Sequence, residues 1–411
     1  MAGNRSAAAH VALGTATTSL SKWFLVWLFA RSAGGADAVG VYSYVLAIAT
    51  PLFVLSQLGL RTIFLSSATR WPWRTYLLLR LIGCLVGAAV LMAVIVFSPD
   101  LPVGLGVAIT LLKVFDSVLD IMLARMQYGN RLVALGRVVT ACGVGAMVAA
   151  AVAVVLTGSA TIGVFAAALS SVGAAVWAFL AGRSVDYEPT DSSRGWRDIV
   201  RTAAPVTASQ FLATFLFQLP VFALSWVADA GTIGVFAGAA YLLTVAGLTG
   251  STLQTVLITP FRRIREHDGV HALRRRAGRI TVRAVLVSAG FGVLVTALGS
   301  PVLTLVYGPG FEMGYVPLAL LAVAAVATIG AFVMSVTLNV LNRYGGVTLA
   351  MGLSCVAAAL AGGLFHLLGL PPLIVATGMS ATGSSFRLLM MTWSVRRAVA
   401  MPAGPASASG A

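Results

Sequence analysis

The sequence predicts an all-α integral membrane protein of about twelve transmembrane helices, arranged as two six-helix bundles. Of its 411 residues, 59% are hydrophobic and 9% are charged, whereas a globular domain carries roughly 25% charged residues. Apolar runs of about twenty residues recur along the chain, each long enough to cross a bilayer core. The loops between the runs alternate between arginine-rich and arginine-poor. This composition leaves room only for short loops outside the membrane, and we expect no catalytic residue, metal or cofactor.

The apolar runs define the expected helices in order. The first run is too long for the core of a signal peptide, so it is taken as the first span. The expected spans lie near residues 8–30, 39–60, 76–97, 101–124, 132–156, 161–182, 203–228, 233–259, 284–306, 315–341, 346–368 and 371–394. They divide the chain into an N-terminal bundle (1–182), a cytoplasmic linker (183–202), a C-terminal bundle (203–394) and a disordered cytoplasmic tail (395–411).

The arginines orient the spans. Nearly all of them lie in every second loop, and only Arg31, beside Asp37, lies on the other side. By the positive-inside rule, both termini are cytoplasmic. The formal charge of +15 is therefore mainly a topology signal, and no nucleic-acid partner is expected. The arginines on the cytoplasmic side are Arg61, Arg70, Arg74, Arg125, Arg131, Arg183, Arg194, Arg197, Arg201, Arg262, Arg263, Arg265, Arg274, Arg275, Arg276, Arg279, Arg283, Arg343, Arg396 and Arg397.

One of these loops, between the eighth and ninth spans, holds more arginine than orientation needs. It is interpreted as a patch that meets anionic lipid headgroups, or a diphosphate, at the cytoplasmic surface. The predicted patch comprises Arg262, Arg263, Arg265, Arg274, Arg275 and Arg276.

The two halves show a weak internal repeat. With an offset of 194 residues, 13–40 aligns with 207–234 without gaps, and Gly40-Val41-Tyr42 falls on Gly234-Val235-Phe236. Because each half has six spans, both enter the membrane from the same side. The halves would then be parallel repeats related by a pseudo-two-fold axis along the membrane normal, which suits two bundles rocking about a shared cavity.

Short motifs, placed in order along the spans, resemble the polysaccharide or O-antigen flippase family (oligosaccharide flippases) of the multidrug/oligosaccharidyl-lipid/polysaccharide exporter superfamily. Each motif is weak alone, but together they are distributed over nearly the whole chain. They are Phe29-Ala30-Arg31 with Gly34, Gly40 and Tyr42; Gln57-Leu58-Gly59-Leu60; Leu123-Ala124-Arg125-Met126-Gln127 with Arg131 and Arg137; Pro260-Phe261-Arg262-Arg263; and Leu305-Val306-Tyr307-Gly308 with Phe311.

The resemblance implies two six-helix bundles that flip a polyprenyl-diphosphate-linked oligosaccharide from the cytoplasmic to the outer leaflet for cell-surface polysaccharide biosynthesis. It implies a bacterial cell (inner) membrane, membrane lipids around the protein, and a polysaccharide polymerase and glycosyltransferases as partners in the same pathway. Members share layout more than functional residues, so no site residue is carried over from the family.

Ionisable residues within spans are candidate site residues, because burying a charge in the bilayer is costly. Lys22 and Lys113, the only lysines, lie near the middle of the first and fourth spans. A cation at that depth would attract the diphosphate or an acidic sugar. The alternative is that Lys22 pairs with an acid across the bundle.

The fourth span carries Lys113, Asp116 and Asp120 on one helical face, which must point into the protein. Lys113 and Asp116 are close enough along the helix to pair, which would leave Asp120 to meet Arg125, Arg387 or a coupling ion. Such a pair predicts that removing either member lowers folded yield and removing both restores much of it.

Other polar residues in the spans have two interpretations each. Gln57, Gln210 and Gln218 would line a sugar path or form interhelical hydrogen bonds. Arg387 would face the cavity or snorkel to the interface, whereas Arg80 is expected to snorkel.

Two rival functions stay open. A cation-coupled multidrug exporter of the same superfamily needs a membrane carboxylate, and the first and seventh spans contain none. A membrane glycosyltransferase or polymerase needs a sizeable extramembrane loop and catalytic acids or histidines, which this sequence does not supply.

Overall fold

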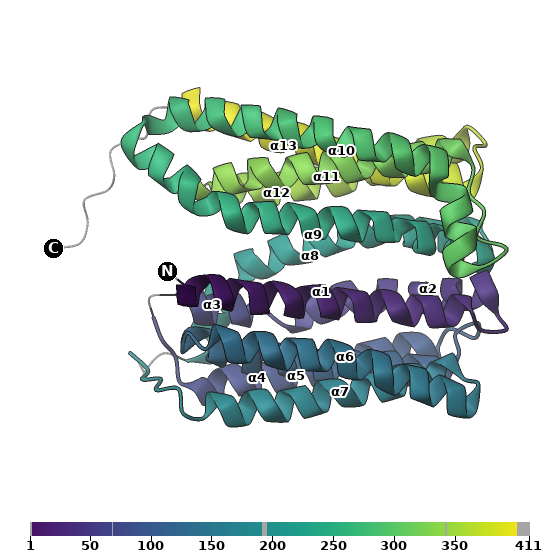
Figure 1. The fold of residues 1–411 in the computed structure, drawn as a ribbon, viewed down its shortest axis with the longest axis horizontal. Coiled ribbons are helices and arrows are strands. Elements are labelled where there is room, and N and C mark those ends of the chain that lie inside the picture. The colour runs from purple at the N-terminus through teal and green to yellow at the C-terminus, as the bar shows by residue number, and fades with distance from the viewer. Residues whose placement is uncertain (1, 68, 191–194, 342, 401–411) are drawn as a thin grey trace. The chain divides into compact units, whose positions relative to one another are not determined.

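A computed structural model of the protein describes residues 2–67, 69–190, 195–341 and 343–400, and in these residues the chain is helical without strands (Figure 1). Twelve helices have at least 22 residues, and α3 is a short extra turn. The helices are α1 (Ala2–Ala30), α2 (Gly35–Ser56), α3 (Leu60–Ser66), α4 (Trp73–Val96), α5 (Val103–Tyr128), α6 (Leu132–Thr157), α7 (Ala160–Gly182), α8 (Trp196–Val227), α9 (Ala230–His267), α10 (Gly269–Tyr307), α11 (Tyr315–Val340), α12 (Tyr344–Leu367) and α13 (Pro372–Ala400). The predicted fold class is confirmed.

The chain is a multi-pass membrane protein. Nine helices in the described residues are both long and apolar enough to cross a bilayer. The other three long helices, α1, α5 and α13, are more polar, and α5 carries three charges in its middle. Large apolar side chains such as Leu85, Val155 and Val287 are exposed, which a water-facing surface would not tolerate in such numbers.

Two helices run well past the predicted spans. α9 and α10 have 38 and 39 residues and are separated only by Asp268. The arginine-rich segment between 260 and 283, expected as a loop, is therefore helical. Its Arg, Ala and Leu residues are good helix formers, and the break falls at Gly269, whose φ is +80°.

The chain divides into two compact units. Unit 1 comprises residues 1–214, 229–235 and 306–310, and unit 2 comprises 215–228, 236–305 and 311–411. The boundary falls inside α8, whereas the sequence placed a linker at 183–202. α13 continues to Ala400, and the rest of the predicted tail, like linker residues 191–194, lies outside the described residues.

The same packing pattern occurs inside each unit. In unit 1, α7 packs against both α5 and α6; in unit 2, α13 packs against both α11 and α12. These are equivalent helices under the predicted repeat of six long helices. In unit 1, α1 also lies along α6, where Gly14, Gly136 and Gly143 permit close approach.

The repeat also accounts for a backbone crossing within unit 1. A Cβ on Gly40 of α2 would lie 1.7 Å from the carbonyl oxygen of Ala230, and one on Gly234 would lie 1.9 Å from that of Ala36. Gly40 and Gly234 are equivalent under the offset of 194, and so are Ala36 and Ala230. The contact is thus reciprocal between the two equivalent segments, and only glycine fits at either position.

Candidate functional site: the polar interior of unit 1

The site is built on α5, which packs against α7 and α4 inside unit 1. Its polar side chains Lys113, Asp116, Ser117 and Asp120 follow a helical spacing of three to four residues, so they share a face. Ser117 is fully buried and the other three are half-buried. The predicted inward orientation of this face is confirmed.

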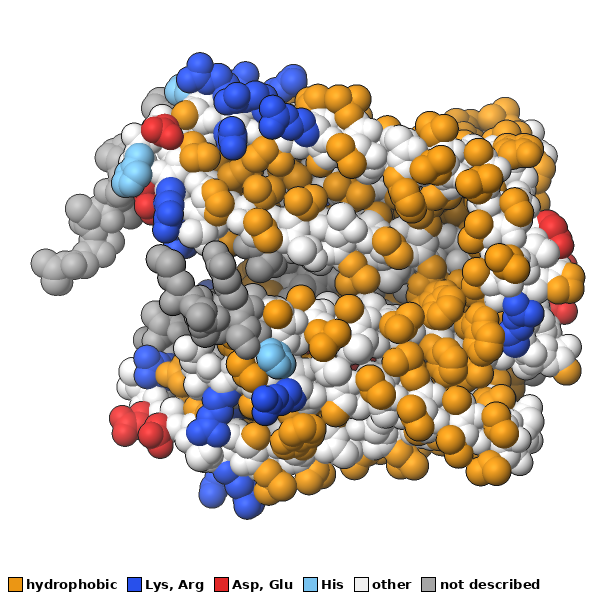
Figure 2. Space-filling view, viewed as in Figure 1, with side chains coloured by type: hydrophobic (Ala, Val, Ile, Leu, Met, Phe, Trp, Pro, Cys, Tyr) orange, Lys and Arg blue, Asp and Glu red, His pale blue; other side chains and the backbone are white. Residues whose placement is uncertain are grey.

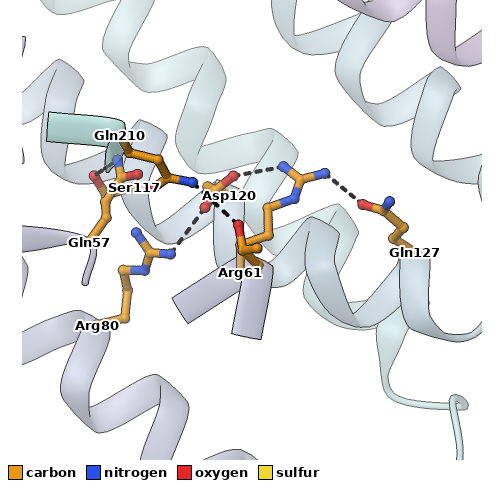
Figure 3. A network of polar contacts seen from close by, with 8 residues as sticks. Gln57, Arg61, Arg80, Ser117, Asp120, Gln127 and Gln210 are labelled. Carbon is orange, nitrogen blue, oxygen red and sulfur yellow. Dashed lines mark hydrogen bonds and ion pairs between the residues drawn. The ribbon is translucent and has the colours of Figure 1, made fainter. Parts of the chain in front are cut away.

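Asp120 joins two arginines from different helices (Figure 3). Its Oδ1 accepts from Arg61 Nη1 at 2.7 Å and its Oδ2 accepts from Arg80 Nη2 at 3.0 Å. Arg61 also donates from Nη2 to Gln127 Oε1 at 2.9 Å. Within unit 1 the partners of Asp120 are thus arginines of α3 and α4, whereas Arg125, one of the predicted partners, donates to the carbonyl oxygen of Val185. A contact of Asp120 with Arg387 or a coupling ion stays a prediction.

The backbone break before α3 explains how Arg61 reaches this network. Leu58 and Gly59 have φ of +51° and +55°, which ends α2 and redirects the chain into the seven-residue α3. The sequence placed Arg61 in a cytoplasmic loop. The signal that could have located it is Gly59, since a glycine at such a φ commonly marks a helix end.

Arg80 does not snorkel. Its side chain is 1% exposed, and among the described residues its Nε and Nη1 have no hydrogen-bond partner. α4 directs it toward α5 instead of the interface, where Asp120 supplies the compensating charge. Arg80 is therefore a buried cation with unused donors next to a carboxylate that it shares with Arg61.

Two of the predicted glutamines belong to the same network (Figure 3). Gln57 donates to Ser117 Oγ at 3.0 Å, and Gln210, from the part of α8 in unit 1, donates to Thr62 Oγ1 at 3.3 Å. Both bonds join different helices. Both side-chain amides therefore form interhelical hydrogen bonds. That they line a path for a sugar stays a prediction.

Lys113 and Asp116 do not pair. Lys113 Nζ donates to Thr50 Oγ1 on α2 at 2.9 Å, and Asp116 Oδ1 accepts from Ser171 on α7 at 2.7 Å. In the described part of the chain neither Lys113 nor Asp116 joins an ion pair, whereas Asp120 joins two. The hydroxyl partners come from neighbouring helices, which the spacing along one helix could not indicate.

Lys22 on α1 lies near enough to Lys113 for the two charges to repel each other, and its side chain is exposed. The interior of unit 1 therefore brings together three cations, Lys113, Arg61 and Arg80, with the carboxylates of Asp116 and Asp120, and the exposed Lys22 adds a fourth positive charge at its edge. Both carboxylates accept hydrogen bonds from protein donors. In the described residues no cluster of His, Cys, Asp and Glu could hold a metal ion.

The remaining predicted cavity residues, Gln218 and Arg387, belong to unit 2. Arg387 is 3% exposed, lies 4.9 Å from the ring centroid of Phe332, and has an Nε without a partner. One helical turn away on α13, Ser384 accepts a hydrogen bond from Thr328 of α11. Snorkelling, one of the two interpretations of Arg387, is excluded by this burial.

Five of the six arginines in the predicted headgroup patch are exposed, and the sixth is partly buried. Arg262, Arg263, Arg274, Arg275 and Arg276 are exposed. Arg265, however, donates to the carbonyl oxygen of Val340 at the end of α11, where a cation suits the negative end of a helix.

No family model and no curated protein matches the chain. Among solved structures it is similar to an outward-facing multidrug resistance MATE family transporter of the MOP superfamily, with a TM-score of 0.67 and 12% identity over 96% of this chain and 95% of that one. An inward-facing structure of such a transporter gives 0.65 and 13% identity over 93% and 94%. A MOP superfamily transporter from Pyrococcus furiosus gives 0.67 and 11% identity over 96% and 95%.

The chain has the fold of the MATE transporters. These matches extend over both halves of the chain, so they account for the predicted pair of bundles. The neighbours are transporters and not enzymes, as expected from the sequence. Identities of 11 to 13% show the fold alone, so the narrower resemblance to the oligosaccharide flippases stays a prediction.

Proposed function

We propose that the protein is a flippase that moves a polyprenyl-diphosphate-linked oligosaccharide from the cytoplasmic to the outer leaflet of a bacterial cell membrane. The observation that carries this proposal is the charge balance inside unit 1. Three cations inside the unit and Lys22 at its edge outnumber two carboxylates there, and each carboxylate already accepts protein hydrogen bonds. A net positive interior attracts a diphosphate or an acidic sugar, and it repels a cationic substrate.

In this proposal the two lysines and the arginine network have different tasks. Lys22 and Lys113 lie in the middle of the membrane, where a passing diphosphate would otherwise lose its hydration without compensation. The unused Nε and Nη1 of Arg80 are further donors beside Asp120. A phosphate oxygen that approached them would compete with Asp120 for the same guanidinium groups. The polymerase and glycosyltransferases of the same pathway would be the functional partners.

The competing function is cation-coupled multidrug export, and the MATE fold suits it equally well. Asp116 is the residue that this function would use, because it is half-buried and its recorded partner is the neutral Ser171. The two functions differ in the sign of the charge that the protein moves.

Transport in proteoliposomes decides between the two functions. The purified protein would be tested with a fluorescent polyprenyl-diphosphate oligosaccharide and, separately, with a cationic dye under a proton gradient. We expect movement of the labelled lipid and no gradient-driven accumulation of the dye. Dye accumulation that Asp116→Asn abolishes, with no lipid movement, would establish the exporter and refute the flippase.

A further inference from the structure

The cytoplasmic end of α10 carries a stripe of arginines on one face. Arg275, Arg279 and Arg283 are spaced four residues apart, so they form one ridge along the helix, and all three are exposed. The opposite face of the same segment is buried through Leu273 and Ala277. Packing therefore fixes the direction in which this arginine stripe points.

No opposite charge neutralises the stripe within the described residues. In those residues none of the three arginines joins an ion pair. Between 262 and 283 the sequence has eight arginines against Glu266 and Asp268. Like charges four residues apart destabilise a helix, so a ridge of this kind is stable when anions surround it. Figure 2 shows the Lys and Arg side chains gathered at this end of the unit.

The same face of α10 continues into its apolar part. Further positions on the face of the arginine stripe are Leu286 and Val293, which are 66% and 69% exposed. From 284 to 307 the helix carries no charge, and its length of about 36 Å covers a hydrocarbon core of about 30 Å. The arginine stripe thus lies where the lipid-facing surface of the helix meets the headgroup layer.

We propose that the arginine stripe is a binding site for anionic phospholipid headgroups of the cytoplasmic leaflet. Guanidinium groups bind phosphate oxygens in pairs, and a hollow of about 640 Å³ lined by Ala272, Arg275 and Arg279 leaves space for them. The acyl chains would lie against Leu286 and Val293. Each arginine contributes about fivefold to the affinity for an anionic surface. This site is separate from the interior of unit 1 and does not depend on the substrate proposed above.

The test measures the thermal unfolding of the detergent-purified protein with added phosphatidylglycerol or phosphatidylcholine. We expect phosphatidylglycerol to raise the unfolding temperature by several degrees more than phosphatidylcholine. The triple variant Arg275→Gln, Arg279→Gln, Arg283→Gln should lose this difference. The matching lysine variant should keep part of it, because the charge remains while the paired phosphate geometry is lost.

The matched control is Arg197→Gln with Arg201→Gln, two exposed arginines also four residues apart, near the start of α8. This variant should respond to phosphatidylglycerol like the wild type. Equal loss in the control would show that any exposed arginine pair suffices and would overturn the site. An unchanged response in the triple glutamine variant would also overturn it. If inorganic pyrophosphate reproduced the full shift, the site would bind a soluble anion and not a lipid.

Discussion

The spans of the two halves pack alike but differ sharply in charge. The predicted N-terminal spans contain six charged residues, namely Lys22, Arg80, Lys113, Asp116, Asp120 and Arg137, whereas those of the C-terminal half contain only Arg387. Unit 2 has instead a hydroxyl pair, Thr328 with Ser384, and an apolar groove of about 700 Å³ lined mostly by small and aliphatic residues of α10, α11 and α13.

The comparison indicates that the helix packing within a unit does not depend on the charged residues of its spans. The reciprocal Gly40 and Gly234 contact and the matching helix pairs in each unit need only small residues and apolar faces. Charge at mid-membrane depth is costly and needs partners, and apart from Arg387 the charged residues of the spans are in the N-terminal half. We therefore propose that substrate recognition is mainly a task of unit 1, and the following variants test that contrast.

The largest expected effect is at Asp120. Replacing it with Leu strands Arg61 and the fully buried Arg80, a loss of about 3–5 kcal/mol, so folded yield and unfolding temperature should fall steeply. Adding Arg80→Leu should recover much of the loss. The control in unit 2, Ser384→Ala, should cost only about 1 kcal/mol. Thermal unfolding in detergent compares the three, and equal losses for Asp120→Leu and Ser384→Ala would remove the contrast between the units.

The glycine crossing should give the next largest effect. Ala at position 40 or 234 would meet backbone atoms of the other helix, an overpacking that costs about 1–3 kcal/mol. Because the contact is reciprocal, Gly40→Ala and Gly234→Ala should lower the unfolding temperature by similar amounts. Gly173 and Gly247 have open space around them, and alanine there should be neutral or stabilising. Strongly unequal effects at positions 40 and 234 would contradict the repeat.

Lys113 and Asp116 should lose stability mainly through different partners. Each bonds to a hydroxyl on a different helix, and removing a charge-assisted hydrogen bond costs about 1.5–3 kcal/mol. The unfolding losses of Lys113→Met and Asp116→Asn should therefore nearly add in the double variant, reduced only by the Coulomb attraction between the two charges one turn apart. A double variant more stable than either single one would restore the direct pair that the sequence suggested.

The smallest effect concerns Tyr187, outside the membrane after α7. Its hydroxyl donates to the carbonyl oxygen of Trp71 at 2.7 Å, and burial, with a smaller contribution from Tyr128, raises the pKa of Tyr187 from 10.0 to about 12. Because the folded-state pKa is the higher one, its contribution to stability is complete below pH 10 and is lost as the pH rises toward 12. Tyr187→Phe should cost about 0.5–1.5 kcal/mol at neutral pH.

The measurement for Tyr187 is the difference in unfolding temperature between wild type and Tyr187→Phe across this alkaline range. We expect the difference to shrink above pH 10. Tyr315, an exposed tyrosine at the start of α11, is the control, and its phenylalanine variant should follow the wild type at every pH. A difference for Tyr187→Phe that stays constant to pH 12 would show that the hydroxyl is not the group involved.

Hydropathy and the arginine distribution predicted the helical fold because both depend on local composition. The span near 39–60, for example, ends where Gly59 breaks the helix. The sequence could not place Arg61 or pair Asp120 with Arg80, because those contacts join helices that are distant along the chain. The spacing of Lys113 and Asp116 along one helix suggested that they pair. That spacing carries no information about Thr50 and Ser171, which come from other helices and bind them instead. The sequence does not predict that α9 and α10 continue through the arginine-rich segment, because a dense run of arginines is typical of a loop between spans.

The central claim, that unit 1 holds a cationic site for a diphosphate-linked substrate, is tested most directly at Lys22. In proteoliposomes containing the fluorescent polyprenyl-diphosphate oligosaccharide, Lys22→Gln should reduce the flipping rate by at least about tenfold, the equivalent of about 1.4 kcal/mol. Lys22→Arg should retain part of the rate, because it preserves the charge. Wild-type flipping by Lys22→Gln, at normal levels of inserted protein, would contradict the claim.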